Sequence, residues 1–548
     1  MKANQNIYII ITSLWFNFSV FSQSPYLVKD INPGVQPSFI SNLTKVDNTL
    51  FFAAYDPTHG LELWKSDGTS SGTTMVKDIN VGANNSVPTR LINANGTLFF
   101  RADDGINGPE LWKSDGTSAG TVMIKNINPS TIDNDVNQIS QILNIDNLVY
   151  FMADNGTNGF ELWKSDGTNA GTIMVKDINP GSGNSYIGWM TNANGTLFFR
   201  AYDGVNGDEL WISNGTETGT QLVKNINPGI NSGLETYPFI TNVDGTVFFV
   251  ANDGINGREL WKSNGTPNGT EMVKDIYPGN NGFTANSSTP WNLINVNGTL
   301  FFTAEDGIHG AELWKSNGLS SNTGLVKDIK PGIFSSYPSE LKNCNGKVYL
   351  QALENNGIKD VWLSDGTESG TNLLKDSNSN TFYSEPVEFI YLNGYVFFVA
   401  TNNTFGRELF RTDGTISGTI GYNIRFGSDS SSPENLTIVD NTLFFTADNN
   451  SNGKELWALS TQPLSISENV NNIKEISIYP NPSNNIINIK NNSNYSINNL
   501  EIISINGAKV FETKFNSQLI SINHLQAGIY IIKIYSDKEV FINKIIKN

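Results

Sequence analysis

The chain has 548 residues, more than the roughly 250–300 at which a single hydrophobic core usually stops growing, so several domains or a repeat array are expected. Aromatic residues make up 11% and charged residues 16%, a balance that argues against an intrinsically disordered chain. The net charge of −17 argues against a nucleic-acid partner, and the single cysteine, Cys344, excludes an intrachain disulfide and a cysteine-based zinc cluster.

Residues 1–22 have the pattern of a secretory signal peptide. Lys2 provides the charged start, residues 7–20 form an apolar stretch, and residues 21–23 offer a cleavage point. A membrane anchor is the alternative, but the apolar run is short and interrupted by polar residues, whereas a span needs about 20 largely apolar residues. We therefore expect an exported chain that has no transmembrane segment after processing.

A Glu-Leu-Trp triplet, or a close variant of it, recurs along the central part of the chain at intervals of 47 to 53 residues. A period near 50 is typical of propeller blades, in which about 40–50 residues form four strands. The aromatic residue of the triplet is Trp64, Trp112, Trp163, Trp211, Trp261, Trp314, Trp362, Phe410 and Trp457.

One repeat, residues 90–127, contains four strand-sized runs that are separated by turns. Asn95-Gly96 is a preferred type I′ hairpin turn between the first two runs. Residues 98–100 are Leu-Phe-Phe, so apolar side chains follow one another without alternation. A strand has this pattern when both of its faces are buried, as in stacked blades, and not when one face of the sheet meets water.

The two ends of the repeat region are complementary. Residues 26–31 match the fourth strand of a repeat that has no beginning, and the last repeat stops at residue 460 without a fourth strand. We therefore predict an all-β fold: a propeller of about nine four-stranded blades over residues 23–460, closed by the N-terminal strand, which removes exposed sheet edges. A miscounted blade and an open solenoid are the alternatives.

The repeats resemble the ELWxxDGT family of secreted bacterial proteins, a resemblance that implies a propeller-like fold and no activity. Complete or nearly complete copies of the motif occupy 62–69, 110–117, 161–168, 209–216 and 259–266. Three repeats have Asn in place of the turn Asp, at Asn214, Asn264 and Asn317.

The recurring polar residues have a structural interpretation. Asp67 and its equivalents precede Gly in a turn, where the Asp side chain binds local backbone N–H groups. Glu62 and its equivalents occur once per repeat, which favours a scaffold role because a catalytic site is normally asymmetric. Trp64 and its equivalents are expected in the core between blades.

The turn between the second and third strands carries acidic residues that are weak candidates for calcium ligands. Ca²⁺ takes about 6–8 oxygen ligands, and no repeat shows a complete set at close spacing, so ordinary turn chemistry is the favoured interpretation. No other cofactor is expected. The candidates are Asp104, Asp203, Asp253 and Asp306.

The segments that join one repeat to the next vary in length and carry aromatic residues. Aromatic side chains on variable loops of a rigid scaffold are a common basis for recognition, and they suit the C–H faces of sugars. In the alternative interpretation, each aromatic side chain packs beneath its own loop. The candidate ligand-binding residues are Tyr186, Trp189, Tyr237, Phe283, Trp291, Phe334, Tyr337 and Tyr383.

No Ser-His-Asp arrangement, phosphate-binding loop or metal-binding spacing occurs in the sequence, so no catalytic residue is predicted. The favoured hypothesis is a non-catalytic propeller on the cell surface that binds a glycan or a protein. A hydrolase or lyase acting on polysaccharide and a purely structural surface component are the alternatives.

Residues 461–472 are predicted to be a linker, and residues 473–548 contain about seven short strand-sized runs. Their spacing of roughly ten residues, with turns between them, predicts a small Ig-like β-sandwich.

This segment resembles the type A C-terminal sorting domain of the type IX secretion system, which is found in Bacteroidetes. The resemblance implies a partner, the secretion machinery, and implies export across the outer membrane, removal of the domain, and attachment to the cell surface or release. A generic adhesive sandwich is the alternative. The matching motif residues are Tyr479, Pro480, Asn481, Pro482, Gly507, Gly528 and Tyr530.

Overall fold

The structure is a computed structural model, which describes residues 24–129, 139–280, 282–354, 357–374, 384–461, 476–491, 496–504, 509–537 and 540–547. The predicted signal peptide lies outside these residues, as do Tyr383, Gly507 and all of the predicted linker except Thr461. The chain divides into two compact units, one of which comprises Pro25–Ser460 while the other contains the residues from Thr461 onward.

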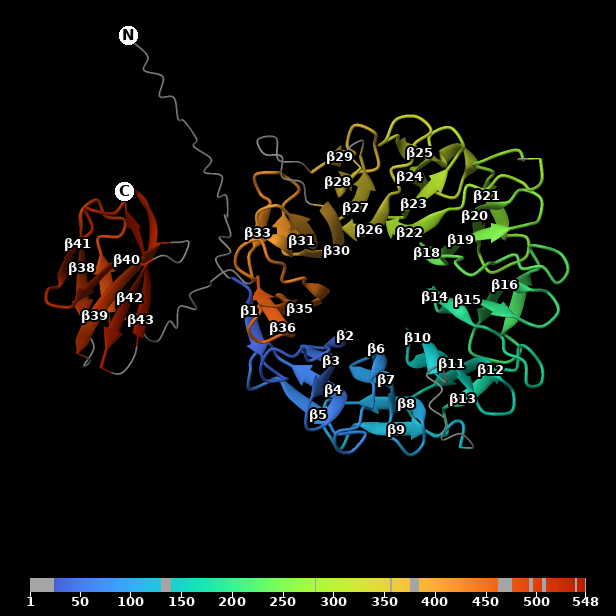
Figure 1. The fold of residues 1–548 in the computed structure, drawn as a ribbon, viewed down its shortest axis with the longest axis horizontal. Coiled ribbons are helices and arrows are strands. Elements are labelled where there is room, and N and C mark those ends of the chain that lie inside the picture. The colour runs from blue at the N-terminus through green and yellow to red at the C-terminus, as the bar shows by residue number, and fades with distance from the viewer. Residues whose placement is uncertain are drawn as a thin grey trace, which may run out of the picture. The chain divides into compact units, whose positions relative to one another are not determined.

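The first unit consists of nine four-stranded antiparallel sheets, the blades, arranged around a ring (Figure 1). Blades 1 to 3 comprise β2 (Ser41–Val46), β3 (Thr49–Asp56), β4 (Gly60–Ser66) and β5 (Thr74–Lys77); β6 (Thr89–Ala94), β7 (Thr97–Asp103), β8 (Pro109–Ser114) and β9 (Val122–Lys125); and β10 (Ile139–Ile145), β11 (Leu148–Asp154), β12 (Phe160–Ser165) and β13 (Ile173–Lys176). Blades 4 to 6 comprise β14 (Gly188–Ala193), β15 (Thr196–Tyr202), β16 (Asp208–Ser213) and β17 (Gln221–Lys224); β18 (Thr241–Val243), β19 (Thr246–Asn252), β20 (Arg258–Ser263) and β21 (Glu271–Lys274); and β22 (Trp291–Val296), β23 (Thr299–Glu305), β24 (Ala311–Ser316) and β25 (Gly324–Lys327). Blades 7 to 9 comprise β26 (Ser339–Cys344), β27 (Lys347–Leu353), β28 (Lys359–Ser364) and β29 (Asn372–Leu373); β30 (Ser384–Leu392), β31 (Tyr395–Asn402), β32 (Gly406–Thr412) and β33 (Ile420–Tyr422); and β34 (Glu434–Val439), β35 (Thr442–Asp448), β36 (Lys454–Ser460) and β1 (Tyr26–Lys29). The predicted nine-bladed propeller is confirmed.

The ring closes as predicted, because the N-terminal strand completes the last blade. β1 pairs antiparallel with β36, with Tyr26 opposite Ala458 and Leu27 opposite Trp457. Val28 is 3% exposed and belongs to the apolar cluster between blades 9 and 1. Blade 9 therefore depends on a strand that lies more than 400 residues away in the sequence.

Local turn chemistry and burial explain each blade. Asn95 and Gly96 have φ of +51° and +83°, as a type I′ turn requires. Leu98 and Phe100 are fully buried and Phe99 is 6% exposed, so both faces of β7 are covered. The consecutive apolar residues therefore mark a strand between two neighbouring blades, as the sequence predicts.

The repeated tryptophan packs between blades and receives a lysine from the preceding blade. Trp64 is 7% exposed, and the Lys29 ammonium lies 5.9 Å from the centre of its ring. The same ammonium donates to the Thr73 carbonyl at 2.7 Å, which fixes it over the indole. Equivalent pairs recur around the ring, with Lys77 over Trp112 and Lys274 over Trp314. Cation–π attraction thus reinforces the apolar contact between successive blades.

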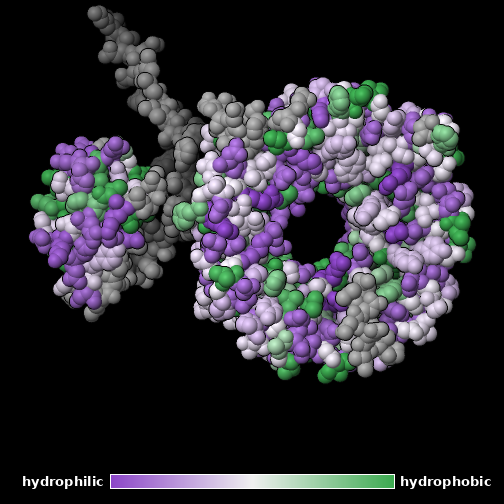
Figure 2. All heavy atoms as spheres, in the orientation of Figure 1, coloured by the Kyte–Doolittle hydropathy of each residue, from purple (hydrophilic) through white to green (hydrophobic). Residues whose placement is uncertain are grey.

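A central opening passes through the ring. The first strand of each blade lies next to the opening and contacts the first strands of the neighbouring blades (Figure 1). Side chains leave this opening visible as a hollow in the space-filling view, and both hydrophilic and hydrophobic residues border it (Figure 2). In the part of the chain that the structure describes, the only helical segment is the single 3₁₀ turn η1 (Ser320–Asn322).

The second unit is a sandwich of two antiparallel sheets, as predicted. One sheet has the order β37-β38-β41 and the other the order β40-β39-β42-β43. Isoleucine side chains such as Ile487, Ile502 and Ile532 are fully buried between them. The strands are β37 (Ile476–Tyr479), β38 (Ile486–Asn491), β39 (Ile497–Ser504), β40 (Lys509–Lys514), β41 (Leu519–Ser521), β42 (Gly528–Ser536) and β43 (Val540–Lys547).

Candidate functional site

One backbone position next to the central opening is unusual in all nine blades. The residue four positions before the end of each first strand has a left-handed backbone, with φ between +50° and +63°, although none of the nine is glycine. We call these nine residues the channel ring. They are Asn42, Arg90, Gln141, Trp189, Phe239, Asn292, Glu340, Glu388 and Asn435.

A β-bulge accounts for this backbone conformation. In blade 4 the register between β14 and β15 shifts between Gly188 and Thr191, and Trp189 lies at the shift. Left-handed backbone costs a non-glycine residue roughly 1–3 kcal/mol, so the surrounding sheet must hold it in place. The backbone is therefore constant around the ring while the side chains vary from acidic to basic, amide and aromatic.

Trp189 of the channel ring is the centre of an aromatic cluster. Its ring centroid lies 5.1 Å from that of Phe239 and 6.3 Å from that of Tyr237. Its indole Nε1 donates a hydrogen bond to the Thr236 carbonyl at 3.0 Å, so the ring is held from its edge as well. We call Trp189, Tyr237 and Phe239 the Trp189 cluster. It joins blade 4 to the segment before blade 5.

Two cavities share Trp189 as a wall. The first, of about 460 Å³, is lined from blades 3 and 4 by residues that include Gln141, Trp189 and Arg200. The second, of about 340 Å³, is lined from blades 4 to 7 by residues that include Trp189, Phe239, Asn292 and Glu340. Five members of the channel ring thus line these two cavities. We take this part of the channel ring as the candidate binding site.

An ion pair anchors the arginine of the first cavity. The Arg200 guanidinium lies 2.9 Å from the Asp208 carboxylate, and both side chains are less than one-fifth exposed. Ser232 donates a further hydrogen bond to Asp208 at 3.2 Å. The sequence places Arg101 and Arg200 at equivalent repeat positions, but Arg101 is only 7% exposed, whereas Arg200 lines a cavity.

The other predicted aromatic residues do not join this cluster. Tyr186 pairs with Tyr202 at 6.2 Å, and the Lys330 ammonium lies 5.8 Å from the Phe334 ring. Trp291 is half-buried at the start of β22, and Tyr337 is 51% exposed on the segment before β26. Of the eight aromatic residues predicted from the sequence, only Trp189 and Tyr237 come together in the described structure.

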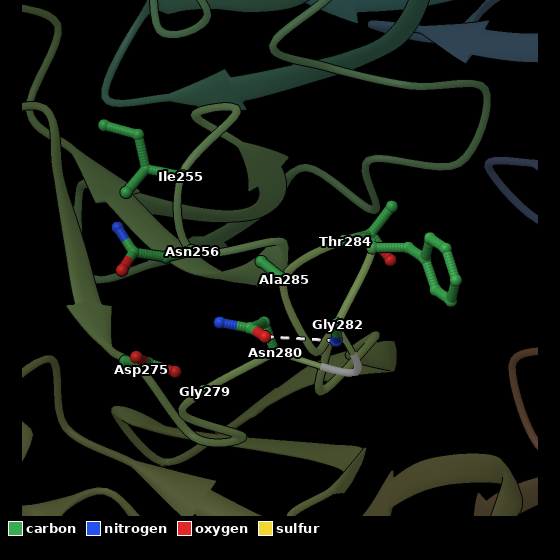
Figure 3. Close-up of a pocket in the computed structure, with 9 residues that line it drawn as sticks. Ile255, Asn256, Asp275, Gly279, Asn280, Gly282, Thr284 and Ala285 are labelled. Carbon is green, nitrogen blue, oxygen red and sulfur yellow. Dashed lines mark hydrogen bonds between the residues drawn. The ribbon is translucent and has the colours of Figure 1, made fainter.

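Phe283 belongs to a different cavity, which lies on the segment after β21. This cavity of about 500 Å³ is lined by Asn256, Asp275 and the stretch around Phe283 (Figure 3). The Phe283 side chain is 98% exposed. Phe283 is the one aromatic residue among the described residues that line this cavity.

Sequence reasoning missed Phe239, Asn292 and Glu340. All three lie in or next to first strands, whereas the search for binding residues concerned the segments between repeats. The signal that identifies them is positional: they stand four residues before the end of the first strand, where the residue type differs in most repeats.

The turn aspartates proposed as weak calcium ligands are engaged by their own turns. Asp253 Oδ1 accepts the backbone N–H groups of Ile255 and Asn256 at 2.9 and 2.7 Å, and its Oδ2 accepts the Asn256 amide at 2.7 Å. Burial raises the pKa of Asp253, but these hydrogen bonds outweigh it and the net shift is downward. The same contacts recur at Asp104 and Asp203, and at Asp306 with His309 in place of Asn. Within the described ranges, no group of three or more His, Cys, Asp or Glu residues is arranged to hold a metal ion.

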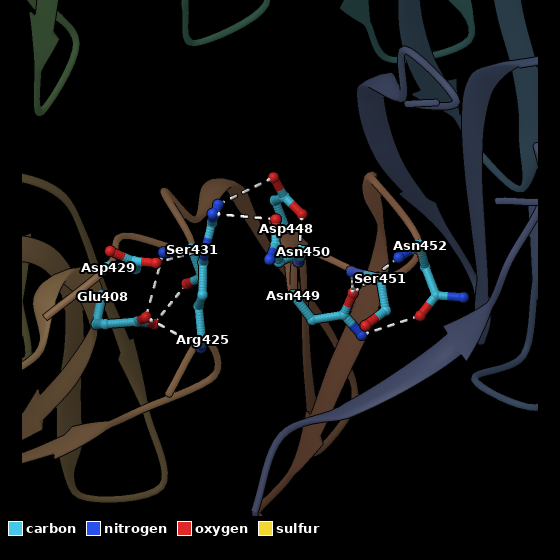
Figure 4. Close-up of polar contacts among 9 residues, drawn as sticks. All are labelled: Glu408, Arg425, Asp429, Ser431, Asp448, Asn449, Asn450, Ser451 and Asn452. Atoms are coloured by element: carbon cyan, nitrogen blue, oxygen red, sulfur yellow. Dashed lines mark hydrogen bonds and ion pairs between the residues drawn. The ribbon is translucent and has the colours of Figure 1, made fainter. Parts of the chain in front are cut away.

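The glutamate of each Glu-Leu-Trp triplet binds the segment that leads to the next blade. Glu259 is fully buried, and its carboxylate accepts the N–H groups of Ile276 and Ser288 at 3.0 and 2.9 Å and the Ser288 hydroxyl at 2.6 Å. Figure 4 shows the same arrangement at Glu408, which accepts N–H groups of Arg425 and Ser431. We call these residues the connector glutamates. They are Glu62, Glu110, Glu161, Glu209, Glu259, Glu312, Glu408 and Glu455.

Burial raises the pKa of the connector glutamates. It raises the pKa of seven of them from 4.5 to about 7, and it also raises the pKa of Glu408. The folded state therefore binds more protons than the unfolded state between these two values, so the free energy of unfolding falls as pH rises through this window. We expect the urea midpoint of the propeller to decrease between about pH 5 and about pH 8.

A single substitution checks the origin of that dependence. Glu312→Gln removes one titrating carboxyl. The free energy of unfolding should therefore depend less steeply on pH in the same window, by the amount that corresponds to one bound proton. Urea titrations of the wild type and the variant at matched pH values measure this. A midpoint that stays constant or rises with pH would contradict the assignment.

Comparison with known families identifies the second unit. Residues 477–548 match the model of the secretion system C-terminal sorting domain. The terminal module is a type IX secretion sorting domain. It directs the chain across the outer membrane to the cell surface, as the sequence motifs predicted. In the part of the chain that the structure describes, no helix has the length and apolar character needed to cross a membrane.

The motif residues of the sorting domain tie its beginning to its end. Asn481 donates its amide to the Lys544 carbonyl at 2.7 Å and accepts the Ile546 N–H at 2.8 Å, both on β43. Tyr479 ends β37 and is 46% exposed, and the Tyr530 hydroxyl on β42 donates to the Gln526 carbonyl at 3.0 Å. Gly528 begins β42.

Several solved structures have a similar arrangement of strands. PorZ, a surface component of the type IX secretion system of Porphyromonas gingivalis, is 11% identical with a TM-score of 0.31, covering 97% of this chain and 87% of its own. A prolyl endopeptidase is 11% identical with a TM-score of 0.36, covering 82% of this chain and 54% of its own. The β-propeller domain of the Trilobed protease from Pyrococcus furiosus is 10% identical with a TM-score of 0.31. This match covers 64% of the present chain and 100% of that domain. A comparison with curated proteins found no significant match.

Proposed function

We propose that this protein is a non-catalytic propeller of the cell surface that binds a carbohydrate at the Trp189 cluster. The supporting observation is that the Trp189 ring is held by two aromatic neighbours and one hydrogen bond, between two cavities next to the central opening. The negative face of an indole attracts the C–H groups of a sugar ring, and a ring that is already fixed loses little entropy on binding.

The proposal also assigns roles to the two ends of the chain and a family to the repeats. Residues 1–22 act as a signal peptide for export from the cytoplasm, and residues 473–548 engage the type IX machinery at the outer membrane. The repeats belong to the ELWxxDGT type, on the basis of the Glu-Leu-Trp triplets and the Asp-Gly turns that follow them. The nine-bladed unit is then the part that meets ligands outside the cell.

The Trp189→Ala variant tests the binding site. Removing the central ring of the cluster should weaken glycan binding at least about tenfold, the effect typical of an aromatic hot-spot residue. A glycan array identifies the bound sugar, and calorimetry with that sugar measures the affinity of the wild type and the variant.

Phe283→Ala is the matched control, because it also removes an aromatic side chain from the propeller but lies 98% exposed at a different cavity. It should bind as the wild type does. A blank array for the wild type, or equal affinity for Trp189→Ala, would overturn the proposed function and direct attention to protein ligands.

A further inference from the structure

The two cavities beside Trp189 are neighbours along the wall of the central opening. Gln141 and Arg200 lie on one side of Trp189, and Asn292 and Glu340 lie on the other. Because both cavities share the same indole, a ligand that stacks on Trp189 has space to continue in two directions. A single sugar unit would occupy only part of this space.

A glycine creates the first cavity. Gly188 stands opposite Arg200 in the pairing of β14 with β15, and a Cβ atom added at Gly188 would meet nothing within 4 Å. Its backbone does not have a positive φ, so no turn or strain requires a glycine there. The equivalent position carries a side chain in other blades: Ser41, Thr89, Ser140, Trp291, Ser339 and Glu434. Among these blades, only blade 4 therefore lacks a side chain at this position.

The charges around the groove do not favour an anionic ligand. The guanidinium of Arg200 is paired with the Asp208 carboxylate at 2.9 Å, so together they carry no net charge. The second cavity is lined by a carboxylate, Glu340, and by the neutral Asn292. A sugar that carries its own carboxylate would meet a net negative charge, whereas hydroxyl groups find amide and guanidinium partners there.

From these observations we propose that the two cavities are adjacent subsites of one groove, which holds a linear, uncharged oligosaccharide across Trp189. This inference rests on the proposed function and adds the class of ligand. It predicts that affinity increases with chain length until both subsites are filled. It also predicts discrimination against oligomers of uronic acids.

The test is an array of linear glucose, mannose, galactose and xylose oligomers of about one to six units, together with oligogalacturonates and oligomannuronates, probed with the full chain. The strongest binding is expected among neutral oligomers of about three or more units, at least about tenfold above the monosaccharide. The Gly188→Trp variant fills the first subsite and should reduce binding of the longer oligomers to the level of the short ones.

Gly324→Trp is the matched control, because a Cβ atom at Gly324 on β25 also meets nothing within 4 Å and no cavity described above includes this residue. Urea midpoints of both variants that equal the wild-type midpoint show that folding is preserved. Gly188→Ser is a milder second variant, because serine is the residue found at this position in blades 1, 3 and 7.

The outcomes separate the two proposals. Absence of binding to every sugar overturns the proposed function. Binding that is lost in Trp189→Ala but unchanged in Gly188→Trp, or that is strongest for the uronate oligomers or independent of chain length, overturns this inference alone.

Discussion

The Val28→Asp variant should open the propeller ring. Val28 is 3% exposed in the cluster that joins blades 9 and 1, where it packs with residues such as Phe52 and Leu456. A carboxylate has no partner in that apolar cluster, so burying it costs several kcal/mol, and detaching β1 instead leaves the edge of β36 unpaired. We expect the free energy of unfolding to fall by about 4 kcal/mol or more.

Two measurements check this prediction. Urea unfolding followed by tryptophan fluorescence reports the stability of the ring, and limited proteolysis reports whether residues 25–31 have left blade 9. The control is Val122→Asp, which introduces the same charge at an exposed position of the fourth strand of blade 2. Equal midpoints and equal protease resistance of the two variants would show that β1 does not hold the ring closed.

The Glu259→Ala variant should have the second large effect. Removing the carboxylate leaves the buried N–H groups of Ile276 and Ser288 without their acceptor, and each such loss costs about 1–3 kcal/mol. The expected total is about 3–5 kcal/mol, and the segment between blades 5 and 6 should become accessible to proteases. The size of the effect reflects the buried donors that lose their acceptor.

Glu271→Ala is the control for this variant. Glu271 lies in the same blade, but its side chain is 59% exposed in an ion pair with Lys262, and exposed pairs contribute about 0–1 kcal/mol. Urea midpoints of both variants near neutral pH measure the difference. If Glu259→Ala is no less stable than Glu271→Ala, the connector glutamates do not hold the segments between blades.

The sequence alone determined the architecture of this protein. The period near 50, the Asn-Gly turns and the consecutive apolar residues of each second strand depend on interactions within a few residues, so they are readable without tertiary contacts. The two incomplete ends of the repeat region also predicted ring closure, because residues 26–31 lack the rest of a repeat and the last repeat, which stops at residue 460, lacks a fourth strand. The spacing of the short strand-sized runs after residue 473 likewise predicted the terminal sandwich.

Only the tertiary structure decided the candidate site. Trp189 and Tyr237 are 48 residues apart, and they meet because consecutive blades lie side by side. Neither the left-handed backbone at Trp189 nor the cavity opposite Gly188 has a local signal, since the first is imposed by a bulge and the second by what neighbouring strands leave unfilled. A repeating sequence specifies the average blade through local rules. The differences that form a site depend on which side chains the ring brings together.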